Sequence, residues 1–207
     1  MTVIDLEPAT RATADLIGGI DDALLDAPTP CPDYTLGDLL DHIGGLALAF
    51  AAAATKKTGD ATSRAPAVVA SRLGEDWRTR IPRDLAAMAR AWRDPSAWSG
   101  MTRVGGIDLP GEVAGVVGLD EVVIHGWDVA RASGQVYDVD QGPLVVVHDF
   151  LQRSADSARG SDRGPFGPPI RVPDTAPLLE RAVGLSGRDP GWSPTHTPGP
   201  GARTSAS

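Results

Sequence analysis

The chain has 207 residues, 42% of them hydrophobic, and a formal net charge of -8 at pH 7. This length and composition predict one domain with a good-sized core, since two full domains would need a longer chain. The acidic excess, without a long run of Lys or Arg, argues against nucleic acid or an anionic membrane surface as a partner. A single cysteine excludes an intrachain disulfide.

The N-terminal sequence MTVIDLEPAT lacks the basic and apolar regions of a signal peptide. No uninterrupted apolar run approaches the 18 or more residues typical of a membrane-spanning helix. We therefore expect a cytoplasmic protein that does not span a membrane.

Apolar residues at helical spacing predict a first helix over 6–27, which ends at a connector with three prolines in residues 28–32. A second helix is expected to start at Thr35, where the Thr35 hydroxyl and the Asp38 carboxylate form a variant of the capping box. His42 lies about 40° from Leu46 on a helical wheel, at the margin of the apolar stripe of this helix. Its side chain can therefore point into a helix bundle.

The middle of the chain is predicted as an exposed loop over 55–67 and a third helix over 68–93, which Pro82 should kink or divide. The Gly-rich stretch 96–110 is predicted as a loose crossover, although residues 101–109 suit an extended pair as well.

The most informative stretch is 111–134, a helix that is apolar on nearly every side and is therefore expected to be buried. Glu121 and His125 are four residues apart, so their side chains leave the helix on one face. Asp128 extends the same stripe. Gly134 is the expected C-cap.

A buried carboxylate such as Glu121 must be paired, protonated or bound to a metal. Taken alone, Glu121 and His125 suit an internal hydrogen-bonded pair as well as a metal site, and His42 alone suits a structural core histidine. Taken together, two histidines and one carboxylate form a common ligand set that leaves coordination positions open on a divalent metal.

After the central helix, a helix with Pro143 in its first turn is predicted to end near Arg159. His148 lies on its inner stripe, where it is either a core histidine or a reserve metal ligand. Residues 165–169 are predicted to form an ordered surface strap, and 176–185 a short helix. We expect a single helical domain over 1–192 and a disordered Pro/Gly/Ser/Thr tail over 193–207.

Four strings together resemble a known family: CPDYTLGDLLDHIGG, LDEVVIHGWDVARASG, PFGPPIRVP and GRDPGW. They are similar to DinB-like metal-binding proteins related to the N-terminal domain of mycothiol-dependent maleylpyruvate isomerase, over about residues 6–192. The resemblance implies an all-α DinB-like four-helix bundle, here with a short extra C-terminal helix and a disordered tail. It also implies metal ligands at His42, Glu121 and His125, the metal usually being zinc or another divalent ion.

Two functions follow from such a site. In the first, the protein is a thiol-dependent, mycothiol-type transferase or isomerase that acts on a small electrophilic molecule. Asp128 would then orient a ligand or accept a proton, and Arg131 would pair with Asp128 or with a substrate carboxylate. Alternatively, Asp128 and Arg131 form an ion pair on the helix surface.

In the second, a non-catalytic binding protein holds a structural metal, which requires a fourth ligand such as His148. Cys31 is a poor candidate nucleophile, because no His or basic residue is near it in the sequence to lower its pKa. We expect Cys31 to lie about two helical turns from the metal.

Overall fold

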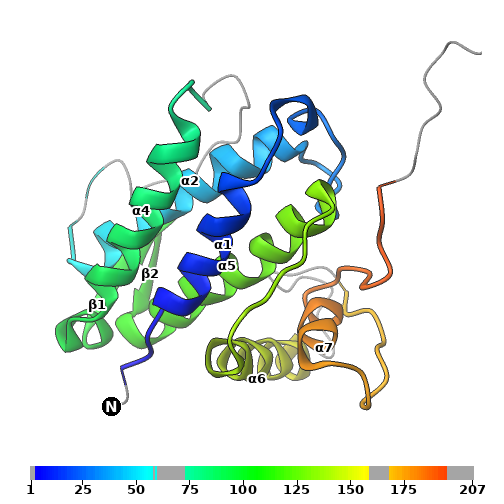
Figure 1. Ribbon diagram of the computed structural model, residues 1–207. Coiled ribbons are helices and arrows are strands. Elements are labelled where there is room, and N and C mark those ends of the chain that lie inside the picture. The colour runs from blue at the N-terminus through cyan, green and yellow to red at the C-terminus, as the bar shows by residue number, and fades with distance from the viewer. Residues whose placement is uncertain (1–2, 58, 60–72, 159–167, 195–207) are drawn as a thin grey trace, which may run out of the picture.

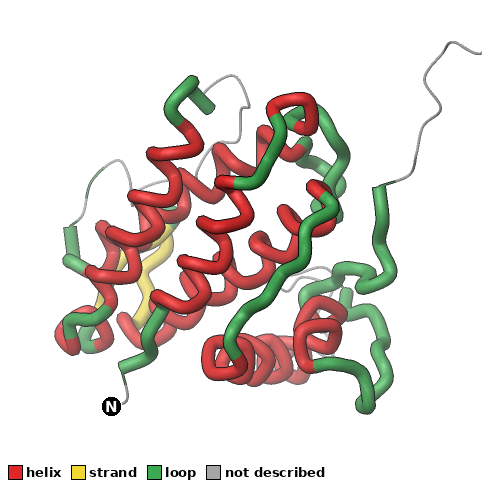
Figure 2. Tube along the Cα trace, in the orientation of Figure 1, coloured by secondary structure: helices red, strands yellow, loops and turns green. Residues whose placement is uncertain are grey.

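The computed structural model describes residues 3–57, 59, 73–158 and 168–194. Four helices form a bundle: α1 (Glu7–Gly18), α2 (Leu36–Ala54), α4 (Trp77–Trp92) and α5 (Gly111–Ser133). Helices α1 and α2 each pack against both α4 and α5, which closes the ring of four (Figure 1). The predicted all-α four-helix bundle is confirmed, and Figure 2 shows how little strand accompanies it.

Two further helices lie at one side of the bundle. Helix α6 (Gln141–Ala158) packs against α5, and the short α7 (Leu178–Leu185) packs against α6. In Figure 1 they form a separate layer below α5, with α7 in orange. The predicted extra C-terminal helix is present and starts two residues later than expected.

Helix α1 is shorter than the predicted first helix over 6–27. It ends at Gly18, and the backbone N–H of Gly19 donates to Leu16 and Ile17 carbonyls as a cap. The chain then makes a separate 3₁₀ turn over Asp22–Leu24. Two successive glycines weaken the helix at this point, and the apolar spacing continues into the turn without revealing the break.

Helix α2 begins as predicted, with Thr35 as its N-cap. The backbone N–H of Asp38 donates to Thr35 Oγ1 at 3.2 Å, and the N–H of Thr35 donates to Asp38 Oδ2 at 3.1 Å. By length and composition α2 is the one described helix that could cross a membrane, but 61% of that window is buried inside the protein. A core helix of a folded bundle has the same character.

Helix α4 runs through Pro82 without interruption, so of the two expected effects, a kink or a division, the division does not occur. The stretch predicted as a loose crossover contains a 3₁₀ turn, Pro95–Trp98, and an antiparallel hairpin of β1 (Met101–Val104) and β2 (Ile107–Pro110). Its two turn residues, Gly105 and Gly106, both have positive φ, 59° and 84°. Such a turn matches the twist of the paired strands.

Several predictions fall on residues outside the described ones. Most of the predicted loop over 55–67, the beginning of the predicted third helix at 68–72, residues 165–167 of the strap and the tail from 195 onward are among them.

The core is tightly packed where α5 crosses two buried tryptophans. The indole N–H of Trp98 donates to the carbonyl of Trp92 at 2.7 Å, and that of Trp92 donates to the carbonyl of Phe50 at 3.1 Å. These bonds fix both rings. A Cβ atom at Gly115 would lie 2.6 Å from Trp98 and 2.9 Å from Trp92, so only glycine allows α5 to approach this closely.

We predict that Gly115→Ala destabilises the fold by up to about 2 kcal/mol, because an overpacking cost of about 1–3 kcal/mol outweighs the gain of about 1 kcal/mol from better helix propensity. Gly142→Ala in α6 is the matched control, since nothing lies within 4 Å of a Cβ added there. Urea denaturation of both variants measures the difference. An equal or higher stability for Gly115→Ala would contradict this packing.

Candidate metal centre

Helix α5 presents Glu121 and His125 on one face, as their spacing predicts. His125 Nε2 lies 3.1 Å from Glu121 Oε2. The His125 side chain is 8% exposed and that of Glu121 28%, so the pair sits at the edge of the core with its carboxylate reaching towards solvent. The helix continues past the pair and ends at Gly134, whose φ of 70° makes it the predicted C-cap.

Helix α2 brings His42 to the same place. The rings of His42 and His125 meet edge to face with centroids 5.0 Å apart, and His42 Nε2 lies 4.0 Å from Glu121 Oε2. One ligand atom from each of the three residues lies within 4.8 Å of the other two.

This donor set fits a divalent metal. Atoms that each bind one zinc ion at about 2.0–2.2 Å lie roughly 3.0–3.5 Å from each other, so modest rotations of the three side chains would suffice. The chemistry of the set, two imidazoles and one carboxylate, is also suited to zinc.

The ring of His125 is held from behind by Asp128. Asp128 Oδ2 lies 2.9 Å from His125 Nδ1, and the Asp128 side chain is fully buried. A carboxylate on Nδ1 favours the tautomer that leaves Nε2 free to accept a metal. Asp128 therefore lies one helical turn after His125, as the spacing predicts. It contacts Nδ1 of the His125 ring, whereas Glu121 contacts Nε2.

Arg188 is the residue that the sequence analysis missed. Its Nε donates to both oxygens of Asp128, at 2.8 and 3.0 Å, and its side chain is only 15% exposed. Its Nη1 also lies 3.3 Å from the hydroxyl of Ser186. A signal existed, because a buried Asp128 requires a cation. The string GRDPGW supplies that cation, although nothing in the string shows where it folds.

Arg131 does not make the expected pair with Asp128. Its guanidinium donates to the backbone carbonyl of Trp192, from Nε at 2.8 Å and also from Nη2, and it lies over the ring of Trp127. Arg131 and Arg188 thus anchor the same C-terminal segment on α5, one through a carbonyl and one through a buried carboxylate.

The two histidines have opposite electrostatic environments. Burial lowers the pKa of His42 to about 4, assisted by the positive charge of His125 and opposed by Glu121. Burial also acts to lower the pKa of His125, but hydrogen bonds to Asp128 and Glu121 outweigh it and raise that pKa to about 9. Without a metal, one imidazole of the pair is neutral and the other is charged.

The two adjacent carboxyl groups on α5 also differ. Burial acts to raise the pKa of Glu121, but the hydrogen bond and charge of His125 outweigh it and the pKa is lowered. Asp120 faces the core, where burial raises its pKa well above the ordinary value, and its Oδ1 has no hydrogen-bond partner among the described residues. Glu121 is therefore the carboxylate available to a cation.

Two residues considered as possible participants lie outside the cluster. His148 lines a cavity beside α7 and is absent from the group of described His, Cys, Asp and Glu side chains that converge here. Cys31 also lies outside that group, although the connector brings it near enough to Asp128 and Arg188 to feel their charges. Burial raises the pKa of the Cys31 thiol, which disfavours a nucleophilic thiolate.

Residues 6–130 match the family described as the mycothiol maleylpyruvate isomerase N-terminal domain. The chain belongs to this family. The matched residues include the convergent triad and Asp128, whereas Arg188 lies beyond them.

Two relatives of this chain are uncharacterized proteins from two strains of Mycobacterium tuberculosis. Each is 28% identical over 184 residues, which cover 87% of this chain and 93% of the relative. Crystal structures of mycothiol-dependent maleylpyruvate isomerase and of a histidine-to-alanine mutant have TM-scores of 0.55 and 0.54. They are 20% and 17% identical and cover 74% of this chain and 71% of theirs, a likeness that shows the shared fold.

We predict that Asp128→Asn destabilises the protein by about 3–5 kcal/mol, because it leaves the Arg188 guanidinium buried without a counter-charge. The double variant Asp128→Asn with Arg188→Gln removes both charges and should be no less stable than the single variant. Urea denaturation of the wild type, of Asp128→Asn, of Arg188→Gln and of the double variant measures this coupling. Costs that simply add would show that the two side chains do not form a buried pair.

The metal-free protein should be most stable near pH 6.5, the ordinary pKa of histidine. The folded-state pKa of His125, about 9, lies above the unfolded value, so its contribution is complete below pH 6.5 and is lost as pH rises through about 9. The folded-state pKa of His42, about 4, lies below the unfolded value, so folding is penalised as pH falls from 6.5 towards 4.

Urea midpoints measured in the presence of a chelator test this pH dependence. The variant His125→Gln should lose the decline on the alkaline side and keep the one on the acid side. Stability of the metal-free protein that increases from pH 6.5 to 9 would contradict the assigned charge of His125.

Proposed function

We propose that His42, Glu121 and His125 bind a divalent metal, most readily zinc, and that the protein is a thiol-dependent transferase or isomerase. Its substrate would be a small electrophilic molecule and its thiol a mycothiol-type one. The observation that carries the proposal is the convergence of three ligand atoms within 4.8 Å, contributed by two different helices. The loop-borne Cys31 takes no part.

The small number of ligands supports a chemical role. Structural zinc sites nearly always have four protein ligands and favour cysteine, whereas catalytic sites keep one position open. Within the described ranges no fourth His, Cys, Asp or Glu joins the three. Glu121 is the most exposed of the three, with 28% of its side chain accessible. A bound metal would supply Lewis acidity and would lower the pKa of a coordinated thiol or water.

The surrounding residues would act by positioning. Asp128 is fully buried, so it does not meet a substrate and instead holds the His125 ring through Nδ1. Arg188 holds Asp128 in place through the hydrogen bonds from its Nε to both carboxylate oxygens. Arg131 holds the C-terminal segment at Trp192, a positioning role in place of the catalytic one expected from the sequence.

The thiol is proposed from the family. The family's description names mycothiol, and the two crystal structures with the same fold are of a mycothiol-dependent enzyme. Maleylpyruvate is named for those enzymes and is not carried over as the substrate of this chain. The alternative function, a binding protein with a structural metal, would require a fourth ligand.

We predict that the protein, purified without an affinity-metal step, binds about one divalent metal per chain and that His125→Ala abolishes binding. His148→Ala is the matched control, because His148 is a similarly buried histidine on the neighbouring helix α6 and is outside the triad. Elemental analysis measures the metal, and far-UV circular dichroism verifies that both variants retain their helices. Stoichiometric metal in His125→Ala would refute the ligand assignment.

Cobalt substitution separates the two functions. An open position predicts that titration with a small thiol changes the visible spectrum of the cobalt protein, because sulfur enters the coordination sphere. A spectrum of full protein coordination that is indifferent to thiol would favour the structural metal site instead.

A further inference from the structure

A second polar cavity lies between α6 and α7, apart from the triad. It has a volume of about 280 Å³, and its lining includes His148 of α6, Arg181 of α7 and Arg171 of the segment that precedes α7. None of the three metal-site residues lines it. The function proposed above assigns this cavity no role.

One wall of the cavity is held firmly against α7. The backbone N–H of Ile170 donates to the carbonyl of Gly184 at 2.8 Å. A Cβ atom at Gly184 would lie 2.4 Å from the Val172 side chain and 2.8 Å from the Ile170 carbonyl, so the segment is packed onto the helix at the closest possible approach. The position of Arg171, between Ile170 and Val172, is fixed by these contacts.

The cavity has an excess of positive charge. Arg171 and Arg181 line it, and neither guanidinium forms an ion pair or hydrogen bond with another described residue. Among the described residues of the lining, Asp174 is the only acidic one. Two arginines against one aspartate is unusual for a chain whose net charge is -8. A guanidinium has a planar set of donors that matches carboxylate and phosphate groups.

His148, which lines the cavity, carries a ring nitrogen that has no hydrogen-bond partner among the described residues. The residue is 9% exposed, and its Nδ1 lies 3.5 Å from the carboxylate of Asp149. Its Nε2 is buried and has no hydrogen-bond partner among the described residues. Leaving such a nitrogen unpaired costs free energy, which a ligand oxygen would recover.

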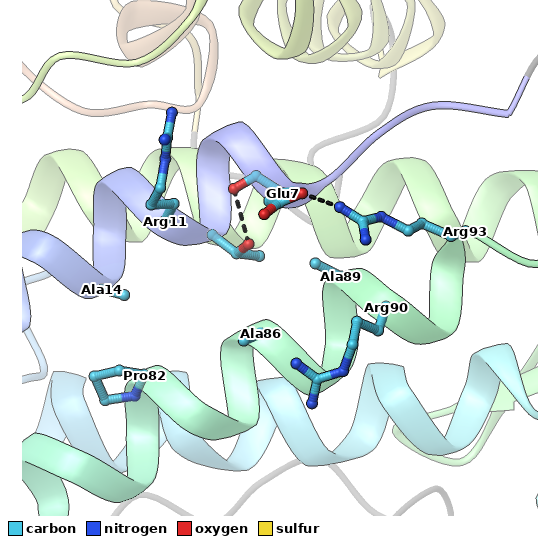
Figure 3. A pocket seen from close by; sticks show the side chains of 9 residues that line it. Glu7, Arg11, Ala14, Pro82, Ala86, Ala89, Arg90 and Arg93 are labelled. Carbon is cyan, nitrogen blue, oxygen red and sulfur yellow. Dashed lines mark hydrogen bonds and ion pairs between the residues drawn. The ribbon is translucent and has the colours of Figure 1, made fainter.

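The groove between α1 and α4 provides a useful contrast. It has a volume of about 240 Å³ and is also lined by arginines, but Arg93 is already paired with Glu7. Figure 3 shows Arg11 and Arg90 extending away from each other, over a floor of small side chains. No histidine lines this groove. This groove therefore has positive charge, but among the described residues it has no buried donor that lacks a hydrogen-bond partner.

We propose that the cavity between α6 and α7 binds a small organic anion through a carboxylate or phosphate group. Arg181 and Arg171 pair with the anionic oxygens, and Nε2 of His148 donates a hydrogen bond to the anion. The volume of about 280 Å³ exceeds that of a bare ion and accommodates a short organic acid or a small phosphate ester. The site is independent of the metal centre.

The test uses the full chain with sodium phosphate and sodium succinate as separate probes, titrated at constant ionic strength against sodium chloride. We expect saturable binding by calorimetry that Arg181→Gln and His148→Gln each weaken about tenfold or more. Arg90→Gln, which removes the same charge from the other groove, should leave the affinity unchanged. Binding should persist in His125→Ala, which separates this proposal from the proposed function.

The two probes distinguish the source of the anionic group. Binding of phosphate alone identifies phosphate esters, binding of succinate alone identifies carboxylic acids, and either supports the site. The ring signals of His148 in proton NMR of the wild-type protein should shift with the same saturation, which covers the case of a variant that does not fold. Absence of saturation for both probes, or equal weakening by Arg90→Gln, would overturn the proposal.

Discussion

The buried ion pair between Asp128 and Arg188 is the interaction on which the rest of the site depends. Helix α5 is buried on nearly every side, so a charge on its inner face has no water to stabilise it. Asp128 is fully buried and meets its cation 60 residues further along the chain. One electrostatic requirement therefore ties the segment after α7 to the middle of the bundle, and Arg131 strengthens the same attachment through Trp192.

The Asp128–Arg188 pair positions the metal-site residues one after another. Arg188 fixes Asp128, Asp128 fixes the ring of His125 through Nδ1, and Nε2 is thereby turned towards Glu121 and His42. Three segments of chain, namely α2, α5 and the C-terminal segment, must all be in place before the triad has its shape. The pKa values of the two histidines shift in opposite directions, because only His125 has a carboxylate on each ring nitrogen.

The sequence predicted what depends on local spacing. The i, i+4 pair of Glu121 and His125, the inward-facing His42 and the capping box at Thr35 follow from helix periodicity, which acts over one or two turns. The spacing of residues within a helix does not show which distant segment of the chain packs against that helix, so Arg188 was missed. The end of α1 was mispredicted and the hairpin was left as one of two alternatives, since both are decided by glycines whose conformation the apolar pattern does not reveal.

The separation of Asp128 and Arg188 along the chain has a consequence for biosynthesis. A ribosome adds roughly 5–20 residues per second, so the 60 residues between the two partners take several seconds to make. For that interval Asp128 lacks its cation, and the His125 ring lacks the support that Arg188 gives it through Asp128. The segment that carries Arg188 thus determines when the cluster is fully aligned, and a nascent chain released before that segment is made would carry all three ligands without this support.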